Sequence, residues 1–143
     1  MEIINFDDTK HRSGVLMVLK SVFNYKDARN NPEMLIDKKL AVNDDLFFVA
    51  TENGEVIGTV MAGYDGHRGW IYSLAVVPEY RRRLVGTKLL EHAESKLSKL
   101  GCVKINLQIL LSNENVKNFY LKNGFKVEER ISMGKEISEN IKK

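Results

Sequence analysis

The 143-residue sequence lacks features that mark several classes of protein. Its single cysteine, Cys102, excludes an intrachain disulfide and a cysteine-based metal cluster, and it fits a reducing cytoplasm. No apolar run approaches the length of a membrane span, and the acidic, polar start does not resemble a signal peptide. The histidines show no pattern of metal ligands. We therefore predict a cytoplasmic protein with no membrane partner and no metal.

The sequence also lacks a large excess of either positive or negative charge. The chain has 22 Lys and Arg against 19 Asp and Glu, which gives a net charge of +3. Its basic run, Arg81–Arg83, is short and has no accompanying aromatic ladder, so nucleic-acid binding is not favoured. A hydrophobic content of 43% is ordinary for a soluble globular protein. The length predicts a single domain, residues 1–143, with a proper core.

Apolar periodicity predicts helices and strands along the whole chain. The first part should hold a strand over 2–6, a helix capped by Asp8 or Thr9, and a second helix that begins at Asn31 and Pro32. Strands over 46–50 and 56–61 should form a hairpin, because Asn53-Gly54 is the dipeptide that type I′ turns select. A turn over 65–69 should lead into a strand over 70–77.

The remaining segments complete the predicted fold. We expect a helix over 84–100 that Gly101 ends, a strand over 103–111, a helix from Asn113 to Gly124, and one or two antiparallel strands over 125–137. Together the segments predict an α/β (α+β) fold with a mixed, mostly antiparallel sheet of six to seven strands, flanked by about four helices.

The stretch Leu74–Leu90 predicts a ligand. It reads as a buried strand, an arginine-rich loop and the start of an amphipathic helix. A loop that feeds a helix N-terminus presents unpaired N–H groups and the positive end of the helix dipole, and three arginines add bidentate donors. These features favour a phosphate, and we interpret it as the pyrophosphate of a coenzyme.

The same residues resemble a known family. Residues 74–90 are similar to the acetyl-CoA motif of the GNAT superfamily of N-acetyltransferases, hydrophobic-x-Val-x-Pro-x-x-Arg-Arg-x-Gly-x-Gly-x-x-Leu-Leu, except at Leu84. Residues 113–125 resemble the second motif, Asn-x-x-Ala-x-x-Leu-Tyr-x-x-x-Gly-Phe. The segments 63–69 and 132–135 resemble the small stand-alone bacterial branch called YpeA-like.

The resemblance implies direct acetyl transfer from acetyl-CoA to a primary amine, with no covalent enzyme intermediate. Backbone groups near Leu74 and Val76 would hold the pantetheine arm and polarise the acetyl carbonyl, Asn113 would contact the pantetheine, and Tyr120 would be the general acid. The pyrophosphate would be cradled by N–H groups of the loop and its arginine side chains: Arg81, Arg82, Arg83, Leu84, Val85, Gly86 and Thr87.

The residues themselves set two limits on this mechanism. A phenol titrates near pH 10 and a thiol near 8.5, so complete proton transfer from Tyr120 is uphill by roughly 2 kcal/mol, and the phenol would act mainly as a hydrogen-bond donor. Leu84 stands where the family has glycine. It is harmless if the backbone stays helical and its side chain enters the helix–sheet interface, and otherwise it crowds the phosphates.

The acceptor amine is left open by the sequence. Asp65, His67 and Tyr72 are candidates for contact with it, although Asp65 and His67 also fit an ordinary solvated turn. The strand over 70–73 has no carboxylate to act as a base, so deprotonation could run through water or Tyr72. A protein N-terminus, a lysine, a polyamine and an antibiotic all remain candidates.

The alternatives to an enzyme are a non-catalytic acyl-CoA-binding or regulatory module, and an interaction domain with a decayed groove. Relatives often form homodimers, and the sequence leaves the oligomeric state open.

Overall fold

The computed structural model describes residues 1–23 and 31–137. The chain groups into two compact units, Met1–Leu107 and Gln108–Lys143, and each is described by itself. Within the described residues, no helix combines the length and the apolar character needed to cross a membrane.

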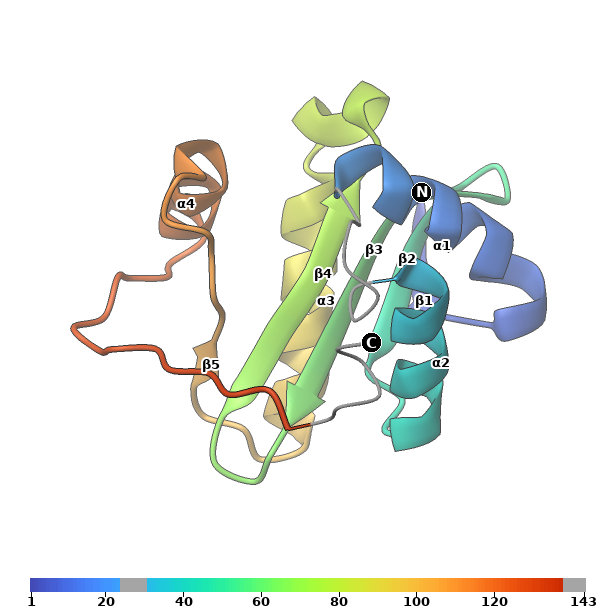
Figure 1. Ribbon diagram of the computed structural model, residues 1–143. Helices are drawn as coiled ribbons and strands as arrows, with labels where there is room; N and C mark the ends of the chain where they lie inside the picture. Colours follow the sequence, from blue (N-terminus) through green and yellow to red (C-terminus); the bar gives the residue numbers. More distant parts are fainter. Residues whose placement is uncertain (24–30, 138–143) are drawn as a thin grey trace. The chain divides into compact units, whose positions relative to one another are not determined.

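The first unit is built on a five-stranded sheet with the order β1-β2-β3-β4-β5 (Figure 1). The strands are β1 (Glu2–Asn5), β2 (Phe47–Glu52), β3 (Glu55–Tyr64), β4 (Gly69–Val76) and β5 (Ile105–Asn106). The first four are antiparallel to their neighbours, whereas β5 runs parallel to β4. The class of fold is therefore as predicted, a mixed and mostly antiparallel α+β sheet, but the described residues hold five strands instead of six or seven.

The hairpin between β2 and β3 forms where the sequence predicts it. Asn53 and Gly54 both have positive φ, at 52° and 82°, as a type I′ turn requires. Positive φ carries little penalty for asparagine and none for glycine, so this dipeptide sets the turn that joins β2 to β3.

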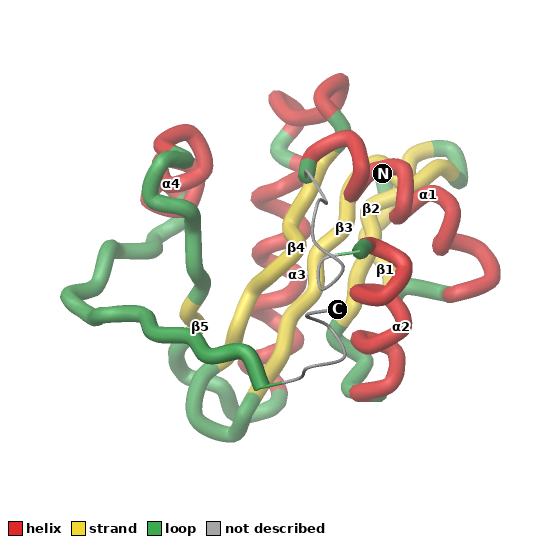
Figure 2. Tube along the Cα trace, viewed as in Figure 1, coloured by secondary structure: helices red, strands yellow, loops and turns green. Residues whose placement is uncertain are grey.

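Helices cover both faces of this sheet. On one face α1 (Asp8–Val22) and α2 (Pro32–Val42) pack over a buried cluster that includes Val15, Leu19, Ile36 and Met61. On the other face lies α3 (Val85–Lys99), which buries an apolar stripe: Val85, Leu89, Leu90, Ala93 and Leu97. In Figure 2, which has the same view as Figure 1, α3 runs behind the yellow strands.

The N-terminal caps of α1 and α2 are of the expected residue types, but the cap of α1 lies one residue earlier than predicted. Asn31 caps α2 as predicted, since its side chain accepts from the N–H groups of Glu33 and Met34. The cap of α1 is Asp7, whose Oδ1 accepts from Lys10 N–H at 3.0 Å, and not Asp8 or Thr9. Asp8 instead lies in the first turn of α1, where a negative charge is favourable.

A surface ion network ties α1 to α2. The Arg12 guanidinium lies 2.6 Å from Asp8, 2.7 Å from Asp37 and 3.4 Å from Glu33. Hydrogen bonds to Asp8 and Asp37 raise the pKa of Arg12 above its ordinary value. The Arg12 side chain therefore connects α1 to α2 by ion pairs on the protein surface.

The second unit contains α4 (Glu114–Lys122). Asn113 caps this helix by accepting from Val116 N–H at 3.3 Å, and Gly124 follows its end with a φ of 91°. The sequence predicts strands over 103–111 and 125–137, but only Ile105–Asn106 is a strand and 125–137 has no regular structure. An alternating pattern produces a strand only where a neighbouring strand completes its hydrogen bonds, and local sequence does not supply that neighbour.

Gly14 sets how closely α1 approaches the sheet. A Cβ atom built at Gly14 would lie 2.8 Å from both Cβ and Cγ2 of Val56 on β3. Real Cβ atoms do not approach this closely, and the Cβ of Val56 cannot turn away because it is fixed to the backbone. The missing side chain therefore lets α1 pack directly on β3.

We expect Gly14→Ala to destabilise the fold by about 1–3 kcal/mol, although alanine is the better helix former. Chemical denaturation followed by circular dichroism measures the change, with the exposed neighbour Ser13→Ala as the control. A gain in stability for Gly14→Ala would show that α1 shifts without cost and would contradict the close-packing argument.

Candidate active site

The edge of β4 is the first component of the site. Strand β5 pairs with β4 only at Gly69 and Trp70, through Ile105 and Asn106. Beyond Trp70, no strand among the described residues of the first unit pairs with this side of β4. The backbone groups of the following residues on this edge are therefore left to other partners.

A β-bulge interrupts β4 beside that edge. Met61 faces Tyr72 and Thr59 faces Ala75, so two residues of β4, Ser73 and Leu74, lie opposite one residue of β3. Ser73 has a φ of 53°, in the left-handed region. Bulges of this kind redirect backbone groups and recur next to active sites.

The ladder shows which backbone groups face the open edge. Val77 N–H donates to Ile57 on β3 at 2.9 Å, and Ala75 pairs with Thr59 on the same side. Because successive residues of a strand direct their backbone groups to opposite sides, those of Val76 and Leu74 face the edge. These are the two residues that the resemblance assigns to the pantetheine arm, and that assignment stays a proposal.

The segment that the sequence predicts to bind phosphate consists of the 3₁₀ helix η2 (Pro78–Arg83) followed, after Leu84, by α3. The first backbone bond of α3 is donated by Lys88 to the carbonyl of Leu84 at 3.0 Å. The N–H groups of Val85, Gly86 and Thr87 consequently have no carbonyl partner within the helix. They give this end of α3 the donors and the partial positive charge that suit a phosphate.

Leu84 meets neither of the two conditions under which leucine would be harmless here, a helical backbone and a side chain in the helix–sheet interface. Its φ of 61° and ψ of 19° place it in the left-handed region and not in the right-handed helix. The residue is 63% exposed, so its side chain is not buried in the helix–sheet interface. The loop keeps the backbone geometry that glycine adopts freely and holds leucine in it at a cost of about 1–2 kcal/mol.

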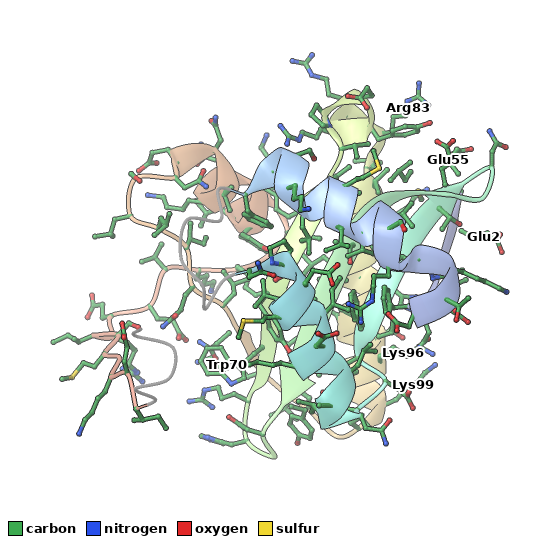
Figure 3. All side chains as sticks on the ribbon, turned by 45° about the vertical axis from the view of Figure 1, so that its right-hand side comes forward. Glu2, Glu55, Trp70, Arg83, Lys96 and Lys99 are labelled. Carbon is green, nitrogen blue, oxygen red and sulfur yellow. The ribbon has the colours of Figure 1, made fainter. Side chains whose placement is uncertain are left out.

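The three arginines of the loop have different surroundings. Arg81 donates from Nε to the carbonyl of Val76 at 3.2 Å, and the Arg83 guanidinium lies 4.9 Å from the centre of the Tyr80 ring. Arg82 contacts neither group, and all three arginines are exposed residues. Figure 3 shows Arg83 at the η2 end of the first unit, with Lys96 and Lys99 near the other end of α3.

The Asp65 carboxylate holds the turn over 65–69 together through hydrogen bonds. Its Oδ1 accepts from the N–H groups of His67 and Arg68, both at 2.7 Å, and its Oδ2 accepts from Trp70 Nε1 at 3.2 Å. The backbone bonds and the indole bond lower the pKa of Asp65 to about 2. A carboxylate with this pKa is a poor base for an amine. His67 is exposed on the same turn, with Nε2 at 3.1 Å from Arg68.

Tyr72 has a neighbour that the sequence analysis misses. The Lys39 side chain of α2 is only 3% exposed, and its ammonium lies 5.3 Å from the centre of the Tyr72 ring. That ammonium pairs with Asp44 at 2.9 Å and donates to the carbonyl of Ala62 on β3. The spacing of Ile36 and Lys39, three residues apart on one helix face, is the signal that could have indicated a buried lysine.

The second unit holds the other two predicted site residues. The Asn113 side chain caps α4, and Tyr120 is 8% exposed. The Tyr120 ring packs edge-to-face against Phe119 and Phe125, with ring centres 5.1 Å and 5.4 Å apart. Burial raises the pKa of the Tyr120 phenol to about 12. The first unit by itself brings together the β4 edge, the bulge and the loop that is predicted to bind phosphate.

Comparison with known proteins gives the class of this chain. Residues 16–125 match the family described as "Acetyltransferase (GNAT) family", so the chain belongs to this family and is an acyltransferase. An acetyltransferase of Pectobacterium atrosepticum is 43% identical over 111 residues, which are 78% of this chain and 79% of that protein.

Solved structures share the fold at lower identity. Ard1 from Thermoplasma volcanium is 23% identical, with a TM-score of 0.78 over 89% of this chain and 83% of its own. AAC(6')-Iy, solved in complex with the bisubstrate analogue CoA-S-monomethyl-acetylneamine, is 18% identical, with a TM-score of 0.76 over 96% of this chain and 98% of its own. These likenesses establish the fold.

We expect Leu84→Gly to leave the fold at least as stable as the wild type, with a gain of up to about 1 kcal/mol. Glycine releases the left-handed strain, and the exposed leucine loses little buried area. Thermal and urea unfolding measure the effect, with Leu84→Ala as the matched control that keeps the strain. A lower stability for the glycine variant than for the alanine variant would contradict this account.

The Asp65 turn predicts a pH dependence. Because the folded pKa lies below the unfolded one, the stabilisation is complete above about pH 4 and is lost as the pH falls toward 2. The difference in unfolding free energy between the wild type and Asp65→Asn should shrink from pH 5 to pH 3 in urea titrations. Glu2→Gln, at an exposed carboxylate, controls for general acid effects. A constant difference would refute the assigned hydrogen bonds.

Proposed function

We propose that this chain is an acetyl-CoA-dependent N-acetyltransferase that moves the acetyl group directly to a primary amine. The observation that carries the proposal is the bulged edge of β4 next to the N-terminus of α3, an edge that no described strand of the first unit pairs with beyond Trp70. This arrangement offers one set of backbone groups to an extended amide-containing chain and another to a diphosphate. Acetyl-CoA has both parts, joined in that order.

The backbone of β4 would polarise the thioester. In acetyl transfer the amine nitrogen forms a bond to the carbonyl carbon, the carbon–sulfur bond breaks, and negative charge develops first on oxygen and then on sulfur. A backbone N–H at the Leu74 side of the bulge, fixed by β3 on the opposite side, is preorganised to stabilise the oxygen. The N–H groups of Val85, Gly86 and Thr87, with the loop arginines, would hold the pyrophosphate.

The acceptor side would include Tyr72. Tyr72 is 41% exposed and lies just before the bulge, with the Lys39 ammonium 5.3 Å from the centre of its ring. The acceptor must lose a proton as it attacks, and Asp65 is a poor base because its pKa is lowered to about 2. We therefore assign the Asp65 carboxylate to shaping the turn and assign proton removal to water or to the Tyr72 hydroxyl.

Tyr120 would assist the departing thiolate as a hydrogen-bond donor. With a phenol pKa of about 12 and an ordinary thiol near 8.5, complete proton transfer is uphill by about 5 kcal/mol. Donation of a hydrogen bond to developing charge requires no such transfer. The final proton would then reach the thiolate from solvent or from the amine.

The proposed function is tested by measuring both the binding of acetyl-CoA and its turnover. Calorimetry with acetyl-CoA should show binding, and free CoA should be released when the right amine is added from a panel of a peptide N-terminus, a lysyl peptide, spermidine and an aminoglycoside. Tyr120→Phe should lower kcat by roughly 10- to 100-fold and leave the affinity for acetyl-CoA nearly unchanged. Tyr64→Phe, in the turn region of the first unit, is the matched control.

Three outcomes separate the competing readings. Binding together with release of CoA supports the enzyme, and binding without turnover on any amine supports a non-catalytic acyl-CoA module. Absence of binding would mean that the coenzyme assignment is wrong. Equal turnover by Tyr120→Phe and the wild type would remove Tyr120 from the mechanism.

A further inference from the structure

The ion pair between Lys39 and Asp44 completes the hydrogen-bond ladder between β2 and β3 where β2 begins. Ala62 N–H on β3 donates to the carbonyl of Leu46 at 2.8 Å, which is one of the two bonds that facing residues of an antiparallel ladder exchange. In place of the second bond, Leu46 N–H donates to Asp44 Oδ1 at 3.1 Å, and the Lys39 ammonium donates to the Ala62 carbonyl. Two charged side chains therefore bridge the backbones of the two strands.

These contacts hold the Lys39 ammonium in one place. Its nitrogen lies 2.9 Å from Asp44 Oδ2 and donates to the Ala62 carbonyl, and the side chain is only 3% exposed. An ammonium has three N–H donors, and these two oxygens engage two of them. A lysine in water is mobile, whereas this one is a fixed cation between α2 and β3.

The fixed ammonium lies beside the Tyr72 ring on β4. The distance from Nζ to the ring centre is 5.3 Å, which is within the range of a cation–π contact. The ring also leans along β3, since a Cβ atom built at Gly63 would lie 3.8 Å from Tyr72 Cε1 and 3.9 Å from its hydroxyl oxygen. Contacts from α2 and β3 therefore place the ring, and the residue still reaches solvent next to the bulge.

We infer that Lys39 is a positioning residue for the acceptor amine, because it holds the Tyr72 ring beside the bulge of β4. This inference rests on the proposed function, in which Tyr72 lies on the acceptor side, and deepens it. Lys39 is too buried to contact the acceptor and acts through the ring. Because Asp44 pairs with the ammonium, the pair adds no net charge to the site, and its effect is on the placement of Tyr72.

A neutral version of the ion pair separates positioning from stability. The double variant Lys39→Gln/Asp44→Asn keeps hydrogen-bonding groups at both positions and leaves no charge without a partner. Tyr72→Ala, alone and combined with this neutral pair, completes a double-mutant cycle. Lys38→Gln, at the exposed neighbouring position of α2, controls for the loss of a positive charge from this helix. Thermal unfolding shows that each variant is folded.

The kinetic measurement uses acetyl-CoA and the amine of the panel above that releases CoA fastest. The neutral pair should lower kcat/KM for this amine by roughly three- to tenfold and leave the affinity for acetyl-CoA within about twofold of the wild type. In the Tyr72→Ala background, the neutral pair should change kcat/KM by less than about twofold, because the ring through which Lys39 acts is gone. Lys38→Gln should match the wild type.

A second measurement needs no ligand. Fluorine NMR of protein labelled with fluorotyrosine reports on each tyrosine ring, and the Tyr72 resonance is identified by its loss in Tyr72→Phe. The neutral pair should move this resonance, because the neighbouring cation is gone and the ring is no longer held. The resonance of Tyr80, which lies beside Arg83 instead, should stay in place.

Other results overturn the inference. An unmoved Tyr72 resonance in the neutral pair would show that Lys39 does not place the ring. An equal loss of kcat/KM with and without the ring would show that Lys39 acts by another route, and a parallel loss of affinity for acetyl-CoA would show a general distortion of the site. Failure of the wild type to bind acetyl-CoA or to acetylate any amine would refute the proposed function, and the resonance would still decide whether Lys39 places the ring.

Discussion

The side of β4 that faces away from β3 is the constraint around which the first unit is organised, because beyond Trp70 no strand among the unit's described residues pairs with it. Strand β4 is held by β3 on one side, and its pairing with β5 ends after Trp70. Buried N–H and C=O groups must find partners, and an open strand edge is normally covered or blunted. Here the bulge at Ser73 and the turn that carries Arg81 both lie along that edge. The sheet, η2 and the start of α3 thus meet at an edge that no described strand of the first unit completes beyond Trp70.

The layers of the fold could be predicted because their signals are local. Helical spacing of apolar residues indicates α1 and α3, and the Asn53-Gly54 dipeptide fixes the central hairpin. The strand prediction over 125–137 is wrong for a physical reason. Alternation shows only that a segment could lie on a sheet, and the neighbouring strand that would complete it is not encoded in that segment.

Some features of the candidate site could likewise be predicted from local sequence, and others could not. The motif around Leu74–Leu90 predicts the strand, the loop and the helix start that the structure contains. The left-handed backbone of Leu84 could not be read from its side chain, because leucine disfavours that conformation and the surrounding loop imposes it. The buried position of Lys39 also depends on tertiary packing, since a lysine on a helix is usually exposed. Which coenzyme atoms and which amine the site binds remain predictions.

The Lys39–Asp44 pair has a consequence for how this sequence can change over time. Loss of Asp44 would leave the Lys39 ammonium, whose side chain is only 3% exposed, without its ionic partner, and breaking such a buried pair typically costs about 3–5 kcal/mol, a large part of the stability of a domain this size. Loss of Lys39 would cost less, because the Asp44 side chain is 25% exposed and reaches water. Replacement of both residues by apolar side chains of similar volume is often tolerated. Positions 39 and 44 are therefore expected to vary together among relatives. A sequence that keeps Lys39 should also keep Asp44.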